Sequence, residues 1–524
     1  MDSQRRLFLL QGARLSAAIA GATTFAHARA AGKDYPFSLG VASGSPLPRS
    51  VIIWTRILAD PLGGPVSPSA LKVRWEVADD EAFRRVVAKG IATADPALGH
   101  SVHVDVTRLK PGRMYFYRFM LGDAVSPVGR TRTAPDQIAL PRRLTLAVAC
   151  CQHWDAGHFA AHRHIAAAGP DLVLFLGDYI DERGPYQLEH PQRAVRGAES
   201  LTLADYRKRH AQYRSDPDLQ AAHQAAPWIV TWDDREVDND YAGLRDEGLS
   251  GDFAARRAAA YQAFYEHMPL RLPAVPAGAF GGLRMYQRLD WGRLARFHVL
   301  DTRQYRSPQA CPRAGRGGSN VVSARACAEL RNPKRTMLGA EQAAWLAEGL
   351  ATSRARWNVL AQPSLMAQSS RVPVRKPGDG IFWTDGWDGY PAARRRLLQE
   401  IIKSEADNPL VLSGDMHTFY AAELRADFGR PVSAVNRIVA PEFCATSIAS
   451  DTRSQLYTQE NMKRNPHLKY GRSDKRGFML MDVMPEATVT RFMGLGDVRD
   501  PKSKAATLAT FEVANGSPGL RQTA

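Results

Sequence analysis

The chain has 524 residues, of which 44% are hydrophobic and 23% charged, a composition that excludes disordered, collagen-like and coiled-coil chains. A single hydrophobic core stops growing at roughly 250–300 residues, so we expect at least two domains. The formal net charge of +16 favours polyanionic partners, namely phosphate esters, nucleic acid or anionic envelope surfaces. No basic stripe with interleaved aromatic residues indicates a nucleic-acid-binding module.

The first thirty residues have the three parts of an export signal. Arg5 and Arg6 precede an apolar stretch from Leu15 to Phe25, and small-x-small cleavage sites end at Ala30. We predict a twin-arginine signal peptide over residues 1–30, which engages the twin-arginine export machinery and delivers the mature chain to the periplasm or the medium. The alternative is an amphipathic anchor helix, but the apolar part is shorter than the ~20 residues that span a bilayer. We expect no transmembrane anchor.

Residues 33–132 contain short β-type runs separated by Gly and Pro, with no helical pattern of useful length between them. These runs are Ser50–Ile57, Leu71–Val77, His103–Val106 and Tyr115–Leu121. Several short strands within ~100 residues predict a small all-β domain, a β-sandwich of the immunoglobulin or fibronectin type. Residues 133–142, which contain two prolines, are the expected linker.

Residues 143–524 have a different texture, because short apolar runs now alternate with helical patterns. The predicted helices are Gly157–Ala168, Ala254–His267, Ala340–Ser353 and Ala392–Ser404. Alternation of this kind indicates βαβ units and a largely parallel sheet. The second domain is therefore expected to have an α/β fold.

Each predicted buried strand of this region ends in residues that can bind a metal. Cys150-Cys151-Gln152 follows Leu144–Ala149, Asp178 follows Asp171–Leu176, Asp233-Asp234 follows Trp228–Trp232, Asp301 follows Phe297–Leu300, and Asp415 and His417 follow Leu410–Ser413. Ligands of open α/β sheets bind outside the carboxyl ends of the strands, so these side chains should converge. Any one of them also fits a turn or a structural ion pair.

Converging carboxylates repel one another unless cations keep them charged. Oxygen-rich ligation with one imidazole and one thiolate suits a transition metal together with a hard cation such as calcium. Two such ions can clamp a phosphoryl oxygen and generate hydroxide at neutral pH, which is the apparatus of phosphate-ester hydrolysis. Arg235, Arg303 and Arg306 lie close to these acids in the sequence and can bind phosphate bidentately, or can instead support the acids.

The remaining cysteines fall into two contexts. Cys311 and Cys327 flank a Gly-, Arg- and Ser-rich stretch from Pro312 to Ala326, which is typical of an exposed loop. In an oxidising compartment we expect them to form a disulfide. Cys444 lies in an apolar run and is expected to be an inert core thiol.

At these residues the sequence resembles the PhoD-like family, which comprises alkaline phosphatase D and related phosphodiesterases within the calcineurin-like metallophosphoesterases. The matching segments cover nearly the whole mature chain. They are Gly40-Val41-Ala42-Ser43-Gly44, Trp54-Thr55-Arg56, Cys151-Gln152, Leu176-Gly177-Asp178-Tyr179, Trp232-Asp233-Asp234, Leu300-Asp301-Thr302-Arg303-Gln304-Tyr305, Trp387-Asp388-Gly389-Tyr390-Pro391 and Gly414-Asp415 with His417.

The resemblance implies a four-layer metallophosphoesterase sandwich and a mixed centre of Fe3+ and Ca2+. In that centre Cys151 and Asp178 bind iron and Asp178 bridges to calcium. Further ligands would be Asp181, Asp234, Asn239, Asp415 and His417. Arg235 and Arg303 would be catalytic, and Arg235, Arg303, Arg306 and Trp387 would bind substrate. Cys150 competes with Cys151 for its role, and Asp238 and Asp240 compete with Asn239.

Two positions depart from the family pattern. The family commonly has tyrosine where this chain has Asp181, and histidine where it has Arg235. A carboxylate can still bind iron but lacks the charge transfer of a phenolate. Arginine stabilises charge but does not donate a proton to a leaving group, because its pKa stays above about 12.

We therefore expect an exported, monomeric enzyme that hydrolyses phosphodiesters, phosphomonoesters or both, by means of a metal-activated hydroxide or oxo nucleophile. Its substrates would be small or lipid-linked phosphate esters. A phospholipase D-type or nuclease activity uses the same site with a different approach surface. The non-enzymatic alternative is a basic envelope protein that binds metal or anions through a degenerate site.

Overall fold

A computed structural model of the chain describes residues 35–61, 67–185, 191–271, 279–376 and 378–524. The predicted signal peptide over residues 1–30 lies outside the described residues. No helix in the described ranges combines the length and the apolar character that crossing a membrane requires.

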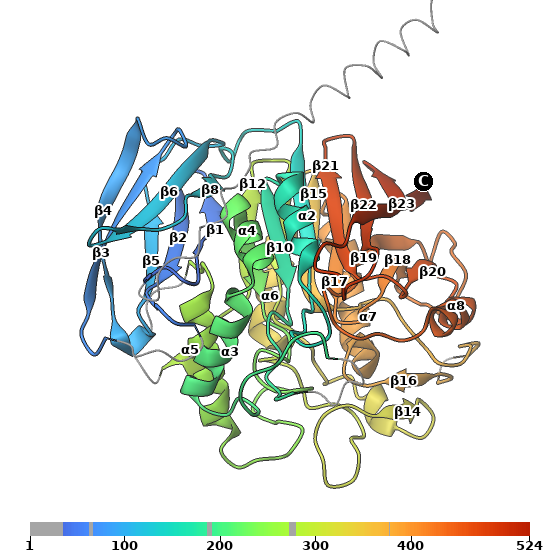
Figure 1. Ribbon diagram of the computed structural model, residues 1–524. Helices are drawn as coiled ribbons and strands as arrows, with labels where there is room; N and C mark the ends of the chain where they lie inside the picture. The colour runs from blue at the N-terminus through green and yellow to red at the C-terminus, as the bar shows by residue number, and fades with distance from the viewer. Residues whose placement is uncertain (1–34, 62–66, 186–190, 272–278, 377) are drawn as a thin grey trace, which may run out of the picture. The chain divides into compact units, whose positions relative to one another are not determined.

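Strands predominate in the fold (Figure 1). The strands are β1 Val41–Leu47, β2 Ser50–Arg56, β3 Leu71–Ala78, β4 Val86–Ala94, β5 Ser101–Val106, β6 Met114–Leu121, β7 Ala124–Val125, β8 Gly129–Arg132, β9 Leu144–Ala149, β10 Leu172–Leu176, β11 Pro227–Thr231, β12 Gln287–Trp291, β13 Ala295–Val299, β14 Val321–Ser323, β15 Trp357–Ser364, β16 Ile381–Trp383, β17 Pro409–Gly414, β18 Phe419–Arg425, β19 Ile438–Cys444, β20 Leu468–Arg472, β21 Gly477–Val483, β22 Ala487–Leu495, β23 Ala505–Ala514 and β24 Arg521–Gln522. The α-helices are α2 Ala160–Ala168, α3 Leu203–Arg214, α4 Pro217–Ala225, α5 Phe253–His267, α6 Gly339–Ala351, α7 Pro391–Ser404 and α8 Gln455–Arg464.

The largest sheet has ten strands in the order β24-β23-β22-β21-β9-β10-β11-β1-β2-β5. Its central strands β9, β10 and β11 run parallel to one another. Every residue of β10 and β11 is buried, as expected for strands that are covered on both faces. The antiparallel strands β21 to β23, red in Figure 1, extend the sheet on one side, and the blue strands β1, β2 and β5 extend it on the other.

A second sheet of seven strands has the order β12-β13-β15-β17-β19-β18-β20. Strands β13, β15, β17 and β19 are parallel, whereas β12 and β18 pair antiparallel at the two sides. One buried apolar cluster joins the two sheets, with Leu146 and Leu174 from the first and Val359 and Leu412 from the second. The carboxyl ends of both parallel sets therefore lie close together.

Helices cover the outer faces of both sheets. Residues of α2, α4 and α5 form one buried cluster with the outward side chains of β9, β10 and β11. Residues of α6 and α7 form another with β15 and β17. The succession of helices, sheet, sheet and helices is a mixed α/β arrangement (Figure 1).

The region up to residue 132 supplies strands to two sheets. Strands β3, β4, β6, β7 and β8 form a five-stranded sheet of their own, whereas β1 pairs in parallel with β11 of the ten-stranded sheet. The two sheets enclose a buried cluster that includes Val41, Ile53, Val77 and Tyr117. Because one face of this sandwich belongs to the large sheet, the predicted boundary at 133–142 does not separate independent sheets. The assignment of a fibronectin-type domain stays a prediction.

Helices α3 and α4 have no counterpart in the sequence prediction. Helix α3 is polar on every side, and its buried residues include Arg209, His210 and Arg214. The guanidinium group of Arg214 lies over the ring of Trp54, 4.4 Å from its centroid. The sequence signal was the capping box, in which the side chains of Thr202 and Asp205 each accept the other residue's backbone N–H. Hydrophobic periodicity missed this helix because its contacts are mostly polar.

A small separate sheet pairs β14 with β16. A disulfide joins Cys311 to Cys327, the two cysteines that the sequence paired, and it encloses β14. Phe382 of β16 packs into the same cluster as Cys327 and Val322. The disulfide-bonded segment therefore supports β16, the strand that carries Trp383.

Candidate active site

Acidic residues gather where the parallel strands end. Three groups of side chains each offer potential ligand atoms, and within each group these atoms lie within 4.8 Å of one another. The groups are Cys151 with Asp178 and His417, Asp178 with Asp233 and Asp234, and Asp234 with Asp240 and Asp385. Because Asp178 and Asp234 each belong to two groups, the three are connected. Four predicted ligands, from the ends of β9, β10, β11 and β17, are thereby brought together.

The backbone at these strand ends adopts an uncommon conformation. Cys151, Asp178, Asp415 and His417 have positive φ angles of 57°, 55°, 63° and 51°. Residues other than glycine seldom adopt this left-handed conformation, which costs about 1–3 kcal/mol at each position. The surrounding structure fixes it, since Cys151 donates its backbone N–H to the Gly177 carbonyl at 3.0 Å. Such strain is concentrated at functional sites.

Glu236 holds two of the ligand-bearing loops in place. Its carboxylate is fully buried and accepts backbone N–H groups from Tyr179 at 2.6 Å and Asp233 at 2.9 Å. A third backbone N–H comes from Asp178 at 3.2 Å. Burial raises the pKa of Glu236 to about 8, although these hydrogen bonds oppose that rise. One side chain therefore fixes the ends of β10 and β11 relative to each other.

The ionised form of the cluster acids is unfavourable in the absence of a cation. Burial, followed by the neighbouring carboxylates, raises the pKa of Asp178 and of Asp415 well above the ordinary value. Among the residues that the structure describes, no donor contacts Oδ2 of Asp415 or of Asp233, although both atoms are buried. Buried acceptors of this kind call for a positive charge, and the donor set fits metal ions.

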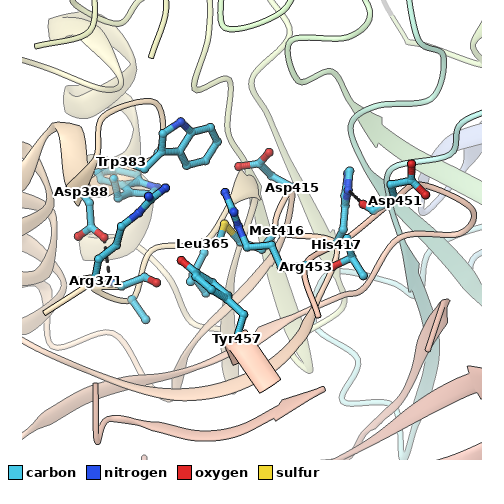
Figure 2. Close-up of a pocket in the computed structure, with 15 residues that line it drawn as sticks. Leu365, Arg371, Trp383, Asp388, Asp415, Met416, His417, Asp451, Arg453 and Tyr457 are labelled. Atoms are coloured by element: carbon cyan, nitrogen blue, oxygen red, sulfur yellow. Dashed lines mark hydrogen bonds between the residues drawn. The ribbon is translucent and has the colours of Figure 1, made fainter. Parts of the chain in front are cut away.

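His417 is prepared to bind a metal through one nitrogen. Its Nδ1 is in hydrogen-bonding contact with the backbone carbonyl of Asp451, drawn as a dashed line in Figure 2. Since a carbonyl only accepts, Nδ1 carries the proton and Nε2 keeps its lone pair. Burial lowers the pKa of His417 to about 4, so the imidazole is neutral at pH 7.

The two adjacent cysteines have different surroundings. Cys151 lies in the metal-binding group, whereas the thiol of Cys150 contacts the carbonyls of Ala445 and Thr446 at 3.8 and 3.6 Å. Cys150 also explains Gly414, because a Cβ added there would lie 2.5 Å from its Sγ. The geometry favours Cys151 as the ligand. Burial raises the pKa of its thiol well above the usual range, so without a cation it stays protonated.

In the loop after β11, the structure favours Asp240 over Asn239 as the candidate metal ligand. The side-chain amide of Asn239 donates to Glu247 at 2.9 Å, and it is Asp240, one of the two competing residues, that lies beside Asp234. Asp240 donates its backbone N–H to Asp234 at 2.8 Å. Asp181 lies farther along the site, 3.9 Å from both Arg235 and His153. The ligand roles of Asn239 and Asp181 stay predictions.

Arg303 and Arg306 are enclosed by the acids. Arg303 contacts Asp233 and donates to Asp385 at 2.7 Å, and Arg306 donates to the other oxygen of Asp385 at 2.6 Å. Both side chains are only 1% exposed, so neither is open to a substrate in this conformation. These ion pairs favour the alternative that the two arginines support the carboxylates, and direct substrate binding by them stays a prediction. Arg235 is more accessible, with 20% of its side chain exposed and Glu182 at 3.3 Å.

A cavity of about 350 Å³ adjoins the cluster. Asp415 and His417 line it at one end, and Trp383, Arg371 and Asp388 line the far end in Figure 2. Trp387, a predicted substrate-binding residue, forms part of the wall but is 1% exposed and donates its indole N–H to Gln362 at 3.0 Å. A substrate that reached Asp415 and His417 would therefore contact this cavity.

Sequence reasoning missed Asp385, and it left Asp301 open between a metal ligand and a structural acid. Asp385 follows no long strand, although it lies two residues before the Trp387 motif, which was the available signal. Asp301 follows β13 as predicted, but its Oδ1 accepts the backbone N–H groups of Arg303 and Gln304 at 2.9 Å. It closes a turn and belongs to none of the three groups of described residues.

Comparison with known proteins gives a consistent picture. The family model "PhoD-like phosphatase" matches residues 146–492, and "PhoD-like phosphatase, N-terminal domain" matches residues 22–135. Alkaline phosphatase D of Bacillus subtilis (strain 168) is 44% identical over 500 residues, which cover 93% of this chain and 82% of the relative.

Solved structures agree with these sequence matches. The structure of PhoD superposes with a TM-score of 0.87 at 43% identity, over 94% of this chain and 92% of that one. A purple acid phosphatase from yellow lupin (Lupinus luteus) seeds has a TM-score of 0.53 at 10% identity, over 90% and 74% of the two chains, and shares the fold alone. The chain therefore belongs to the PhoD-like phosphatases, a family of metal-dependent enzymes that hydrolyse phosphate esters.

Proposed function

We propose that the protein is an exported hydrolase of phosphodiesters, phosphomonoesters or both, with iron and calcium as its metals. The observation that carries this proposal is the connected set of ligand groups beside a cavity that Asp415 and His417 line. The relative from Bacillus subtilis is named alkaline phosphatase D, which supports the same reaction class.

The donor chemistry supports two kinds of metal site. The group of Cys151, Asp178 and His417 offers a thiolate and an imidazole, which suit iron, whereas Asp178, Asp233 and Asp234 offer only oxygen, which suits calcium. The third group differs in degree, because Asp385 pairs with both Arg303 and Arg306, whereas Asp233 of the second group pairs with Arg303 alone. We assign the metals to the first two groups. When bound, they polarise the phosphate ester and lower the pKa of water, which supplies the nucleophile.

The protein's own residues orient the ester and bear its charge. Arg303 and Arg306 hold Asp233 and Asp385 in position from behind. Arg235 follows Asp234 directly, keeps part of its side chain exposed and can stabilise negative charge that develops on a phosphate. With arginine at this position, the enzyme would favour esters whose leaving groups need no protonation.

Export is the second part of the proposal. It rests on Arg5, Arg6 and the cleavage sites, which lie outside the described residues. Replacing both arginines by lysine should leave the precursor in the cytoplasm, as measured by cell fractionation and immunoblotting. Normal export of that double variant would refute the twin-arginine route while leaving the enzymatic proposal intact.

Metal content and turnover test the enzymatic proposal together. The exported protein, purified without chelator, should contain iron and calcium by elemental analysis. It should hydrolyse bis(4-nitrophenyl) phosphate or 4-nitrophenyl phosphate, and a chelator should remove both metal and activity. Protein that carries neither metal nor activity would be a degenerate anion-binding protein instead.

A further inference from the structure

We infer that the far end of the cavity is a subsite for the organic group of the ester, and that it selects an aromatic ring carrying a further phosphate, as in a nucleotide. This inference rests on the proposed function and extends it to the substrate class. The subsite consists of Trp383, Tyr457, Arg371 and Arg453, which line the same cavity as the predicted ligands Asp415 and His417.

Two aromatic rings from different parts of the chain line this end. Trp383 ends strand β16, and Tyr457 lies in the first turn of α8, where the Ser454 side chain accepts its backbone N–H at 3.2 Å. Both side chains are only partly buried, so ring surface remains available to a ligand. Aromatic faces bind planar rings by stacking, largely irrespective of the ring's identity.

The same end of the cavity carries positive charge that the protein does not neutralise. Arg371, which is partly buried, and Arg453, which is exposed, form no ion pair and no side-chain hydrogen bond with any residue in the described ranges. The guanidinium group of Arg453 lies over the Tyr457 ring, 5.0 Å from its centroid, which restricts where it can go. Figure 2 shows Arg371 and Arg453 converging on the space below Trp383.

The carboxylates of the cavity leave that charge available. Asp388 accepts Arg394 at 2.7 Å and the backbone N–H of Ser369 at 2.8 Å, so its charge is already compensated. Asp415, directly after β17, is a predicted metal ligand. The remaining acid, Asp451, lies beyond His417 at the opposite end in Figure 2. Two unpaired guanidinium groups beside stacking rings match a phosphate attached to a ring-bearing group.

The pairing of strand β16 with β14 fixes the position of Trp383. Strand β16 pairs with β14 inside the disulfide-bonded segment, in the register Val321 opposite Trp383. Arg371 is joined to the same strand, because its backbone N–H donates to Ile381 at 2.9 Å. Strand β16, which the disulfide-bonded segment supports, therefore positions both Trp383 and Arg371.

Three esters with the same nitrophenolate leaving group test the subsite in the metal-loaded enzyme. They are methyl 4-nitrophenyl phosphate, thymidine 5′-(4-nitrophenyl phosphate) and the 3′-phosphorylated form of the latter. We expect kcat/KM to rise in that order. Trp383→Leu should lower the thymidine-to-methyl ratio about tenfold, and Trp383→Phe should retain most of it. The pair Arg371→Ala and Arg453→Ala should lower the preference for the 3′-phosphate about tenfold.

Two variants serve as matched controls. Ile381→Ala changes the same strand and Arg375→Ala the same loop, and neither residue lines the cavity. Both should keep the wild-type ratios. Unchanged ratios in the Trp383 and arginine variants would overturn the subsite, even if every ester is hydrolysed. If the wild type hydrolyses none of the esters, the proposed function fails, but calorimetry with thymidine 3′,5′-bisphosphate still decides the subsite. Its binding should weaken about tenfold in the double arginine variant, and equal affinity would refute the inference.

Discussion

The two ends of the cavity are built in opposite ways. The cluster end consists of side chains held directly at the ends of β9, β10, β11 and β17, several of them in strained backbone and most of them buried. The other end consists of long, partly exposed side chains from β16, its preceding loop and the start of α8. The difference indicates that the first end performs a fixed chemistry, whereas the second can vary with the substrate.

The largest effect should come from removing a ligand at the cluster end. Asp178→Asn and Asp415→Asn each delete an anion that the sheet has already positioned, so metal content should fall and kcat should drop by roughly a thousandfold or more. Elemental analysis and nitrophenolate release measure the two effects, and circular dichroism checks the fold.

Asp301→Asn is the matched control, because this strand-end acid closes a turn and an amide can still accept both backbone N–H groups. It should retain the metals. Full activity in either ligand variant would show that the cluster is not the site of catalysis.

The next largest effect should come from removing the disulfide that supports β16 at the other end of the cavity. Replacing both Cys311 and Cys327 by alanine opens a loop with a sequence separation of 16 and should lower the free energy of unfolding by about 3 kcal/mol. Urea unfolding followed by tryptophan fluorescence measures this change. Because β14 holds β16, the preference for ring-bearing esters should fall more than the hydrolysis of the methyl ester. Equal losses on all esters would mean that the segment does not position Trp383.

A pH effect separates the two ends further. In the metal-free protein the pKa of Asp233 is raised to about 6 and that of Asp240 to about 7, mainly by burial. These two carboxyl groups then bind protons more tightly in the folded state than in the unfolded state. Their contribution to stability is therefore fully present below about pH 4 and is lost as pH rises toward 7. Asp234, whose pKa is lowered to about 2, acts in the opposite sense but below that window.

As the pH is raised from 5 to 7.5, the unfolding free energy of the metal-free protein should therefore decrease, by an amount on the order of 2 kcal/mol. The urea midpoint should decrease with it. Metal-loaded protein should not show this fall, because the ions take the place of the protons. A midpoint that is independent of pH in metal-free protein would mean that these acids remain ionised.

The smallest expected effect is on the reaction itself. Arg235→His should raise the rate for alkyl esters relative to nitrophenyl esters by about tenfold and introduce an ionisation near pH 6.5 in the pH–rate profile. Arg235→Lys, which keeps the charge, should do neither. Equal losses on all leaving groups, without a new ionisation, would show that Arg235 clamps phosphate or supports Glu182 instead.

Local patterns predicted the cluster end because parallel strands have a fixed polarity. A buried apolar run followed by an acid gave the positions of Asp178, Asp234 and Asp415, and the predicted strands agree closely with β9, β10 and β17. For Asp301 the same rule left two interpretations open, and the structure favours a turn, because its carboxylate accepts two backbone N–H groups. Helix α3 escaped prediction because its packing depends on charged and aromatic partners rather than on an apolar stripe.

The sequence by itself therefore determined the reaction class and most of the residues that meet at the strand ends, since these follow from strand polarity and residue chemistry. It also indicated the family, through the resemblance of its motifs. Only the tertiary structure showed that Arg303 and Arg306 pair with Asp233 and Asp385, and that Asp240 and Asp385 lie beside Asp234. It alone brought Trp383 and Tyr457 to one cavity. Those contacts join segments far apart in the chain, and no periodicity or spacing within one segment encodes which distant side chain it will meet.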